Sequence, residues 1–340
     1  MAVKRSGITK GIKAVLLVGG FGTRLRPLTH NIPKSFLPVL NRPFLKHTIV
    51  YLKKFGITDI ILTLNYLPDV IRNRFGDGKE YGVHLTYCIE EDPLGTAGAV
   101  KNAEDYLDDT FFVFNGDIFT DMNLADMLAF HRRAKAKATI SLTWVDNPSA
   151  FGVVETDINQ KVKRFIEKPP LNKATTNWIN AGIYILEPEV LKKIPAGEYY
   201  MFEKGLFPRL LDDGSPVYGY TYKGYWLDMG TPQKYFNLKM DLLLKKTRSP
   251  LVKVTVPKLI DRGCKIGAGV SIKGPVIIGK ECTIQDNASL EKAILWDNVR
   301  IGQNSQLNNC IIGSNTVIQD YSKIKDSVVT RSNTIPLSVQ

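Results

Sequence analysis

The sequence predicts an α/β protein, with a mostly parallel β-sheet covered by helices over residues 1–250 and a parallel β-helix over residues 251–340. Two observations support this. In the first part, continuous apolar runs alternate with amphipathic segments, and in the second part an isoleucine or leucine recurs at every sixth position. Runs that are apolar throughout are typical of parallel strands buried on both faces, and a six-residue period is typical of stacked β-helix coils.

The strands of the first domain are expected at five apolar runs. They are AVLLV (14–18), DIILTL (59–64), HLTYCI (84–89), FFVFN (111–115) and ATISLTWV (138–145). Between the first two, PFLKHTIVYLKKF (43–55) has apolar residues at helical spacing, with Pro43 in its first turn and Gly56 after its end, which predicts a covering helix. In such sheets ligands bind outside the carboxyl ends of the strands.

The second domain has apolar residues in six-residue steps at Ile260, Ile266, Ile272, Ile278, Ile284, Leu290, Ile312, Ile318 and Ile324. The stretch between Leu290 and Ile312, with Ile301 and Leu307, is out of phase. Gly267, Gly279, Gly302 and Gly313 are expected at the corners. Each coil needs a neighbour to bury its faces, so we expect this domain to be structural and to join subunits into a homo-oligomer. Acyl transfer, a common reaction of such domains, is disfavoured because all four histidines precede residue 132.

Composition narrows the classes of partner. The net charge of +12 is spread along the chain without interleaved aromatic residues, which favours small anionic substrates over nucleic acid. The basic segment MAVKRSGITKGIK precedes only a short apolar run, too short for a secretory signal or a membrane span. The four cysteines form no CxxC pair, so neither a zinc site nor a disulfide framework is indicated. We expect a cytoplasmic protein.

The loop GGFGTRLRPLT (19–29) directly follows the first predicted strand. Its glycines allow backbone N–H groups to approach a ligand closely, and its arginines offer forked donors to phosphate oxygens. A P-loop is excluded because no Gly-Lys-Ser/Thr follows, and the third glycine of the dinucleotide fingerprint is missing. The loop therefore predicts a polyphosphate site. The alternative is a tight turn with solvated arginines.

Three further polar residues fit the same chemistry. Lys34 could add a positive charge near the phosphates, and Asp117 and Asp228 could share one Mg²⁺ through their carboxylates. Alone, Lys34 would be a solvated surface lysine and Asp117 a helix cap. Glu167 and Lys168 adjoin on a β-prone segment, so they point to opposite faces or lie on a bend.

An ordered series of motifs then resembles the sugar-1-phosphate nucleotidyltransferases over nearly the whole chain. The motifs are GGFGTRLRPLT, Pro33-Lys34, PLGTAG (93–98), NGD (115–117), FGVVE (151–155), FIEKP (165–169), NAGIY (180–184) and WLDMGTP (226–232). This resemblance implies a Rossmann-like nucleotidyltransferase domain followed by a left-handed parallel β-helix. Within the family, the chain is most similar to enzymes that use GTP and mannose 1-phosphate.

The resemblance also implies a role for each matched residue. The catalytic residues would be Arg24, Lys34, Asp117 and Asp228, the last two as ligands of Mg²⁺. The nucleotide site would comprise Val18, Gly19, Gly20, Gly22, Thr23, Arg24, Lys34, Glu90, Pro93, Gly95, Thr96, Asn115 and Gly116. The sugar-phosphate site would comprise Gly152, Glu167, Lys168, Asn180, Gly182 and Trp226.

The implied reaction joins a nucleoside triphosphate (NTP) and a sugar 1-phosphate. A phosphate oxygen of the sugar 1-phosphate attacks the α-phosphorus of the NTP in line, and pyrophosphate leaves. The nucleophile is already an anion, so no general base is needed, and the protein's task is to bring two anions together and stabilise the growing charge.

Base selection is assigned to one carboxylate. Glu90 matches the family's base-contacting position, and a carboxylate can accept both N1–H and N2–H of guanine, which favours GTP. Alternatively, Glu90 is solvated and Glu91 or the backbone reads the base. Two other functions remain open: a glucose-1-phosphate thymidylyl- or uridylyltransferase, and a non-catalytic protein that senses nucleotide sugars.

Overall fold

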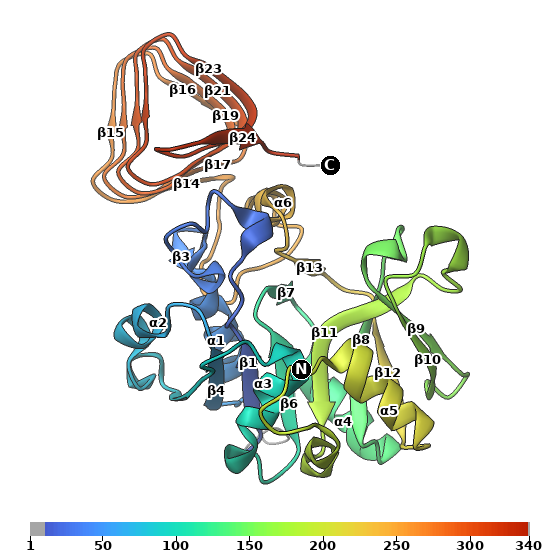
Figure 1. Cartoon of the computed structure of the whole chain (residues 1–340). Helices are drawn as coiled ribbons and strands as arrows, with labels where there is room; N and C mark the ends of the chain where they lie inside the picture. Colours follow the sequence, from blue (N-terminus) through green and yellow to red (C-terminus); the bar gives the residue numbers. More distant parts are fainter. Residues whose placement is uncertain (1–10, 339–340) are drawn as a thin grey trace, which may run out of the picture. The chain divides into compact units, whose positions relative to one another are not determined.

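The computed structural model describes residues 11–338 (Figure 1). Residues 1–10, which make up most of the basic N-terminal segment considered above, lie outside the described range. The chain forms two compact units: unit 1 comprises Met1–Gly20 and Ile49–Trp226, and unit 2 comprises Phe21–Thr48 and Leu227–Gln340. These units describe how the chain packs, and the domain limits 1–250 and 251–340 stay a prediction.

Unit 1 is built on a sheet with the strand order β10-β9-β11-β6-β1-β4-β5, in which β8 pairs with β11 and β12 pairs with β8. The strands are β1 (Lys13–Leu17), β4 (Asp59–Leu64), β5 (His84–Ile89), β6 (Phe111–Asn115), β8 (Ala138–Trp144), β9 (Gly152–Thr156), β10 (Val162–Glu167), β11 (Trp178–Leu186) and β12 (Val217–Tyr222). β6, β1, β4 and β5 are parallel, whereas β11 runs antiparallel to β6, β8 and β9. All five predicted strands are confirmed to within one residue.

Helices bury both faces of this sheet. On one face, Val15 of β1 shares a core with Val100 of α3 (Gly95–Asn102) and Leu210 of α5 (Phe207–Asp212). On the other, Tyr51 of α1 (Phe44–Lys54) packs edge-on against Phe114 at a centroid distance of 6.4 Å. Helix α1 confirms the prediction made for residues 43–55.

The remaining short elements of unit 1 connect these parts. They include α2 (Pro68–Phe75), α4 (Leu124–Ala134) and β7 (Ile118–Thr120). The 3₁₀ helices are η3 (Lys79–Tyr81), η4 (Glu104–Tyr106), η5 (Pro148–Ala150), η6 (Leu171–Lys173) and η7 (Pro188–Lys193), and η8 (Phe202–Leu206) is a π-helix. No helix within residues 11–338 combines the length and the apolar character needed to cross a lipid bilayer.

In unit 2, residues 21–48 pack with α6 (Pro232–Leu243) and the β-helix. This segment holds η1 (Thr23–Leu25), η2 (Lys34–Phe36) and the hairpin of β2 (Pro38–Val39) and β3 (Arg42–Pro43). The Tyr235 hydroxyl donates a hydrogen bond to Pro38 O at 2.7 Å, and Asn41 Nδ2 donates one to Ile278 O at 2.9 Å. The loop that carries Arg24 and Lys34 is thus anchored to the carboxyl-terminal part of the chain.

The β-helix winds in three-sided coils of parallel strands (Figure 1). Its strands are β14 (Lys258–Ile260), β15 (Lys265–Ile266), β16 (Ser271–Lys273), β17 (Val276–Ile278), β18 (Thr283–Ile284), β19 (Ser289–Leu295), β20 (Arg300–Ile301), β21 (Gln306–Ile312), β22 (Val317–Ile318) and β23 (Lys323–Val329). The final strand, β24 (Thr334–Pro336), pairs antiparallel with β23.

The strand register explains why the six-residue step changes phase. Ile260 pairs with Ile278, so the first coil has 18 residues. Ile278 pairs with Leu295, and Leu295 pairs with Ile312, so the next two coils have 17 residues each. One side of each later coil is therefore a residue shorter than the other two. The apolar positions still stack from coil to coil, because the shortening repeats at the same side.

The corners of the coils use residue types that the glycine pattern did not predict. Asn287, Asn298 and Asn304 have left-handed φ of +57°, +59° and +55°. Gly279 has ordinary φ, and a Cβ there would lie 2.5 Å from Asp297 Oδ1, which accepts the Lys280 N–H at 2.8 Å. Asparagine thus makes the turn, while this glycine leaves room for a carboxylate from the next coil.

A lysine lies in the core between α6 and the β-helix. Lys239 is only 1% exposed, and its Nζ lies 3.7 Å from the centre of the Tyr235 ring and 5.9 Å from that of Trp296. Burial lowers the pKa of Lys239 well below 10.5. The buried amine therefore lowers the free energy of unfolding at every pH at which Lys239 is charged in the unfolded chain.

We expect Lys239→Met to raise the melting temperature by roughly 2–4 °C near neutral pH, because it removes the desolvation of the amine while keeping the unbranched chain. The folded-state pKa of Lys239 is below the unfolded one, so the unfolded state binds more protons and wild-type stability rises with pH towards 10.5. The advantage of the variant should therefore shrink as the pH rises. Thermal melts from pH 6 to 10 test this, with the exposed Lys246→Met as control; a destabilised Lys239→Met protein would contradict it.

Candidate active site

In unit 1, the predicted nucleotide residues follow the ends of β1, β5 and β6. Strands β1 and β6 are parallel neighbours, and Leu17 at the end of β1 is in register with Asn115 at the end of β6. The Gly116 N–H donates to Leu17 O at 3.0 Å, and a Cβ on Gly116 would lie 2.3 Å from that oxygen. Position 116 therefore excludes every side chain, and Asp117 follows directly after this close approach.

An unpaired acceptor lies beside this turn. Asn115 Oδ1 is buried and has no hydrogen-bond partner within the described part of the chain. Gly182, with a φ of +72°, brings its backbone so near that a Cβ would be 2.8 Å from Asn115 Nδ2. A buried acceptor without a donor is costly, so a ligand hydroxyl or N–H at this place would stabilise the site.

The two glycines after β1 differ in what surrounds them. A Cβ on Gly19 would lie 2.8 Å from Asn65 N, so the glycine is required by the fold. A Cβ on Gly20 would meet nothing within 4 Å, and its φ is outside the left-handed region. Val18, which precedes them, donates its N–H to Thr63 O at 3.2 Å.

Glu90 is buried, with 8% of its surface exposed, and holds the turn before α3. Its Oε2 accepts the Leu94 N–H at 3.0 Å, and its backbone oxygen accepts from Asn65 Nδ2 at 3.1 Å. Burial raises the pKa of the Glu90 carboxyl, an effect larger than the opposing one of the Leu94 hydrogen bond. One carboxylate oxygen is thus engaged locally, while the exposed Pro93 lies within the same turn.

Gly95 and Thr96 at the start of α3 have packing partners of their own. Gly95 has a φ of +72°, and a Cβ there would lie 2.7 Å from Tyr200 O. Thr96 Oγ1 accepts the Phe202 N–H at 3.0 Å and donates to Glu203 Oε2 at 3.3 Å. These two residues therefore fasten α3 to the segment that precedes α5.

The predicted sugar-phosphate residues gather around β9, β10 and β11. Gly152 faces Glu167 across the β9–β10 pair. Lys168 has a left-handed φ of +48°, and its Nζ lies 3.3 Å from Glu167 Oε1. Of the two alternatives for Glu167 and Lys168, the bend is therefore the one observed.

Asn180 stabilises a β-bulge in β11. The pairing of β11 with β8 shifts register between Asn180 and Tyr184, where Asn180 Oδ1 accepts the Gly182 N–H at 2.9 Å and Nδ2 donates to the Tyr184 hydroxyl at 2.8 Å. Trp226 Nε1 donates to Ala181 O at 2.8 Å inside this bulge. Bulges of this kind redirect side chains and are common beside active sites.

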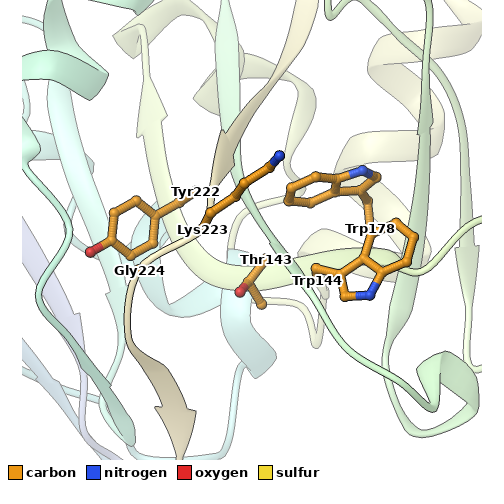
Figure 2. A pocket seen from close by; sticks show the side chains of 6 residues that line it. All are labelled: Thr143, Trp144, Trp178, Tyr222, Lys223 and Gly224. Carbon is orange, nitrogen blue, oxygen red and sulfur yellow. The ribbon is translucent and has the colours of Figure 1, made fainter. Parts of the chain in front are cut away.

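A pocket of about 640 Å³ opens in unit 1 at the ends of β8, β11 and β12. Figure 2 shows Lys223 extending towards Trp144 and Trp178, whose rings meet edge-on at 5.6 Å, while Tyr222 extends away from them. Trp178 and Asn180 are two residues apart on β11, a spacing that places strand residues on one face. The sequence analysis missed these aromatic residues because single tryptophans at strand ends form no motif.

In unit 2, the basic residues lie beside Asp228. Gly22 has a φ of +61°, and Thr29 Oγ1 donates to Gly22 O at 2.7 Å, which holds the loop before Thr23 and Arg24. A Cβ on Gly22 would lie 3.2 Å from Lys34 Cβ. The structure thus brings Lys34 to the glycine-rich loop, as the order of the motifs suggests.

Arg24 and Asp228 both adjoin Gly230. A Cβ at this glycine would lie 3.3 Å from Arg24 Nη2 and 2.9 Å from Asp228 Oδ2. Asp228 also forms an ion pair with Lys234 in the first turn of α6, a residue that the sequence analysis did not select. Nothing in the motif WLDMGTPQK predicts a role for Lys234. It lies close to Asp228 only because the first turn of α6 brings its side chain back towards that residue.

The comparisons with known proteins agree with this architecture. The nucleotidyl transferase family model matches residues 13–245, and the model of the left-handed β-helix domain of the EIF2B epsilon subunit matches residues 245–338. The chain belongs to the nucleotidyl transferase family. The predicted α/β fold with a carboxyl-terminal left-handed β-helix is thereby confirmed.

Individual relatives are more specific. The chain is 40% identical over 86% of its length to a mannose-1-phosphate guanylyltransferase of Mycobacterium tuberculosis, of which the match covers 82%. It is 33% identical to a UTP–glucose-1-phosphate uridylyltransferase of Synechocystis, over 87% of this chain and 86% of that one. A solved structure of HddC from Yersinia pseudotuberculosis complexed with GMP-PN is similar with a TM-score of 0.59 and 29% identity, covering 68% of this chain and 99% of that one. The protein is a sugar-1-phosphate nucleotidyltransferase similar to mannose-1-phosphate guanylyltransferases.

Gly20 allows the predicted phosphate-binding role of the glycine-rich loop to be tested separately from its role in folding. We expect Gly20→Ala to leave the melting temperature unchanged, because the methyl group meets no neighbour, but to raise the KM for the NTP about tenfold, since it hinders backbone approach to the phosphates. Gly116→Ala is the matched contrast and should destabilise the fold. Wild-type kinetics in Gly20→Ala would remove Gly20 from the nucleotide site.

Proposed function

We propose that the protein transfers GMP from GTP to mannose 1-phosphate, giving GDP-mannose and pyrophosphate. The observation that carries the proposal is the 40% identity, over 86% of the chain, to a mannose-1-phosphate guanylyltransferase. The guanine nucleotide named with the similar HddC structure supports the same base.

In this proposal, the candidate residues of each unit would have a different role in the reaction. In unit 2, Arg24 and Lys34 are the cations that would neutralise the triphosphate and the leaving pyrophosphate. In unit 1, Lys168 would receive the sugar phosphate, and the free acceptor Asn115 Oδ1 would bind a substrate donor. Because phosphate oxygens attack as anions, positioning and charge stabilisation account for the catalysis.

Asp117 and Asp228 fit the donor chemistry of Mg²⁺. Magnesium takes one or two carboxylates together with substrate phosphate oxygens and water, and would supply charge neutralisation at the transferred phosphorus. Within residues 11–338 no three His, Cys, Asp or Glu side chains cluster as a ready-made metal site, so substrate oxygens and water would have to complete the proposed Mg²⁺ coordination. Lys234, paired with Asp228, would hold that carboxylate in place until then.

Glu90 remains our candidate for reading the base. Its Oε2 is engaged by the Leu94 N–H, so Oε1 is the oxygen through which guanine N1–H or N2–H would be recognised. Substitution by glutamine retains an acceptor for Leu94, which makes the position suitable for mutation.

The runner-up is a glucose-1-phosphate uridylyl- or thymidylyltransferase, favoured by the identity of 33% to the Synechocystis uridylyltransferase. We also propose a cytoplasmic enzyme that forms a homo-oligomer through its β-helix. Ile260 and Ile266 on the first coil are 42% and 45% exposed. Exposed apolar side chains at this end of the β-helix support it as the contact surface between subunits.

Pyrophosphate release from four NTPs, each with mannose or glucose 1-phosphate and Mg²⁺, tests the proposed activity. We expect GTP with mannose 1-phosphate to give the highest kcat/KM and EDTA to abolish turnover. Asp117→Ala and Asp228→Ala should each remove activity while retaining the wild-type melting curve, because each deletes one proposed metal ligand. Near-wild-type Mg²⁺-dependent turnover in either variant would refute the two-aspartate assignment.

Glu90→Gln tests base reading. The glutamine amide presents a donor to guanine where the carboxylate presented an acceptor, and one mispaired buried group costs about 1–3 kcal/mol. The ratio of kcat/KM for GTP over UTP or dTTP should therefore fall roughly ten- to a hundredfold, with unchanged dependence on Mg²⁺. An unaltered ratio, or a wild-type preference for dTTP or UTP, would show that Glu90 does not select guanine.

A further inference from the structure

A basic pocket of about 550 Å³ follows α6 and lies entirely within unit 2, lined by residues between Leu242 and Val254. Three of its lining residues, Lys245, Arg248 and Lys253, are cations, and none is acidic. No residue of this pocket belongs to the nucleotide or sugar-phosphate sets. We propose that it is a second binding site, for a small organic molecule that carries a phosphate group.

The positive charge of the pocket is not cancelled. Across residues 11–338, no carboxylate lies within ion-pair distance of Lys245, Arg248 or Lys253; Lys245 Nζ instead donates to Thr255 O at 2.8 Å. The neighbouring Lys246 shows the contrast, because it does not line the pocket and pairs with Asp241 at 2.9 Å. The pocket thus brings together three cations for which the described residues provide no anionic partner.

A buried hydroxyl provides a second, independent indication of a ligand. Thr247 lines the pocket and is only 4% exposed, and its Oγ1 has no hydrogen-bond partner in the described part of the chain. A buried hydroxyl left unpaired is costly, and an anionic oxygen in the pocket would accept its proton. Charge and hydrogen-bonding capacity therefore converge on one place.

The loop that forms the pocket is held by its own hydrogen bonds. Ser249 Oγ accepts the N–H groups of Leu251 and Val252 at 3.0 and 2.8 Å, and it lies 3.1 Å from Nδ1 of the buried His47. Burial lowers the pKa of His47 to about 4, so this ring adds no charge at neutral pH. The three cations thus line a preorganised loop, which reduces the entropy lost on binding.

The size and lining indicate the class of ligand. Three cations, one of them the forked guanidinium of Arg248, suit a multiply charged phosphate better than a single carboxylate. The volume lies in the range of sites for organic ligands, and Leu242 and Leu251 offer apolar contact to a carbon skeleton. A phosphate monoester meets both requirements, whereas inorganic phosphate meets only the first.

Binding of glucose 6-phosphate and of inorganic phosphate to the full chain, measured by calorimetry at low ionic strength, tests the proposal. We expect the ester to bind more tightly than phosphate. The double variant Arg248→Ala/Lys253→Ala should weaken the binding of the ester roughly ten- to a hundredfold, while the control Lys246→Ala stays within twofold of wild type. Turnover without either probe should be unchanged in the double variant.

Thr247→Val separates a ligand-binding role from a structural one. It should keep or raise the melting temperature without ligand, because the unpaired hydroxyl is gone, yet weaken ester binding severalfold. Equal affinity of the ester for wild type and the double variant would overturn the proposal, since it would locate all binding at the catalytic residues. Tighter binding of inorganic phosphate than of the ester would overturn the assigned ligand class.

Discussion

The hydrogen bonds that tie residues 21–48 to the carboxyl-terminal part of the chain determine the layout of the candidate site. Asn41 bonds to Ile278 of the β-helix, and Tyr235 of α6 bonds to Pro38. Because of these bonds, Arg24 and Lys34 belong to the same compact unit as Asp228, although about 200 residues of chain separate them. The carboxyl-terminal part of the chain therefore supports the segment that carries the candidate catalytic residues Arg24 and Lys34.

Two motifs lie where the chain passes from one unit to the other. The glycine-rich loop crosses between Gly20 and Phe21, and WLDMGTP crosses between Trp226 and Leu227. Each motif thus contributes residues to both units: Gly19 and Gly20 follow a strand of the sheet, while the residues from Gly22 onwards are held by Thr29.

Several residues at motif positions also have structural tasks. Glu90 holds the turn before α3, Thr96 fastens that helix, and Asn180 stabilises the bulge of β11. These hydrogen bonds fix the positions of the candidate site residues, and a binding site works best when its residues are held in this way. Asn115 Oδ1 differs from these motif residues, because it is buried and has no hydrogen-bond partner in the described part of the chain.

The sequence by itself determined the local periods and residue types. Five strands, helix α1, the six-residue repeat and the motif series follow from patterns between near neighbours, which depend on backbone geometry and on burial of one or both faces. The 17-residue length of the later coils could be recognised only from the register between the strands. In the sequence, the shorter coil is visible only as a break in the six-residue repeat.

Only the tertiary structure decided which distant segments share surroundings. The burial of Lys239 against Trp296 and the pocket lined by Thr143, Trp144, Trp178 and Tyr222 join segments that are far apart in the sequence. The pairing of Lys234 with Asp228 and the basic pocket between Leu242 and Val254 form within short stretches, and depend on how those stretches fold. No spacing rule predicts them, because a lysine on α6 has the same sequence neighbourhood whether the β-helix covers it or water does. Burial and the desolvation that follows arise from packing between segments, so they are set by the fold as a whole.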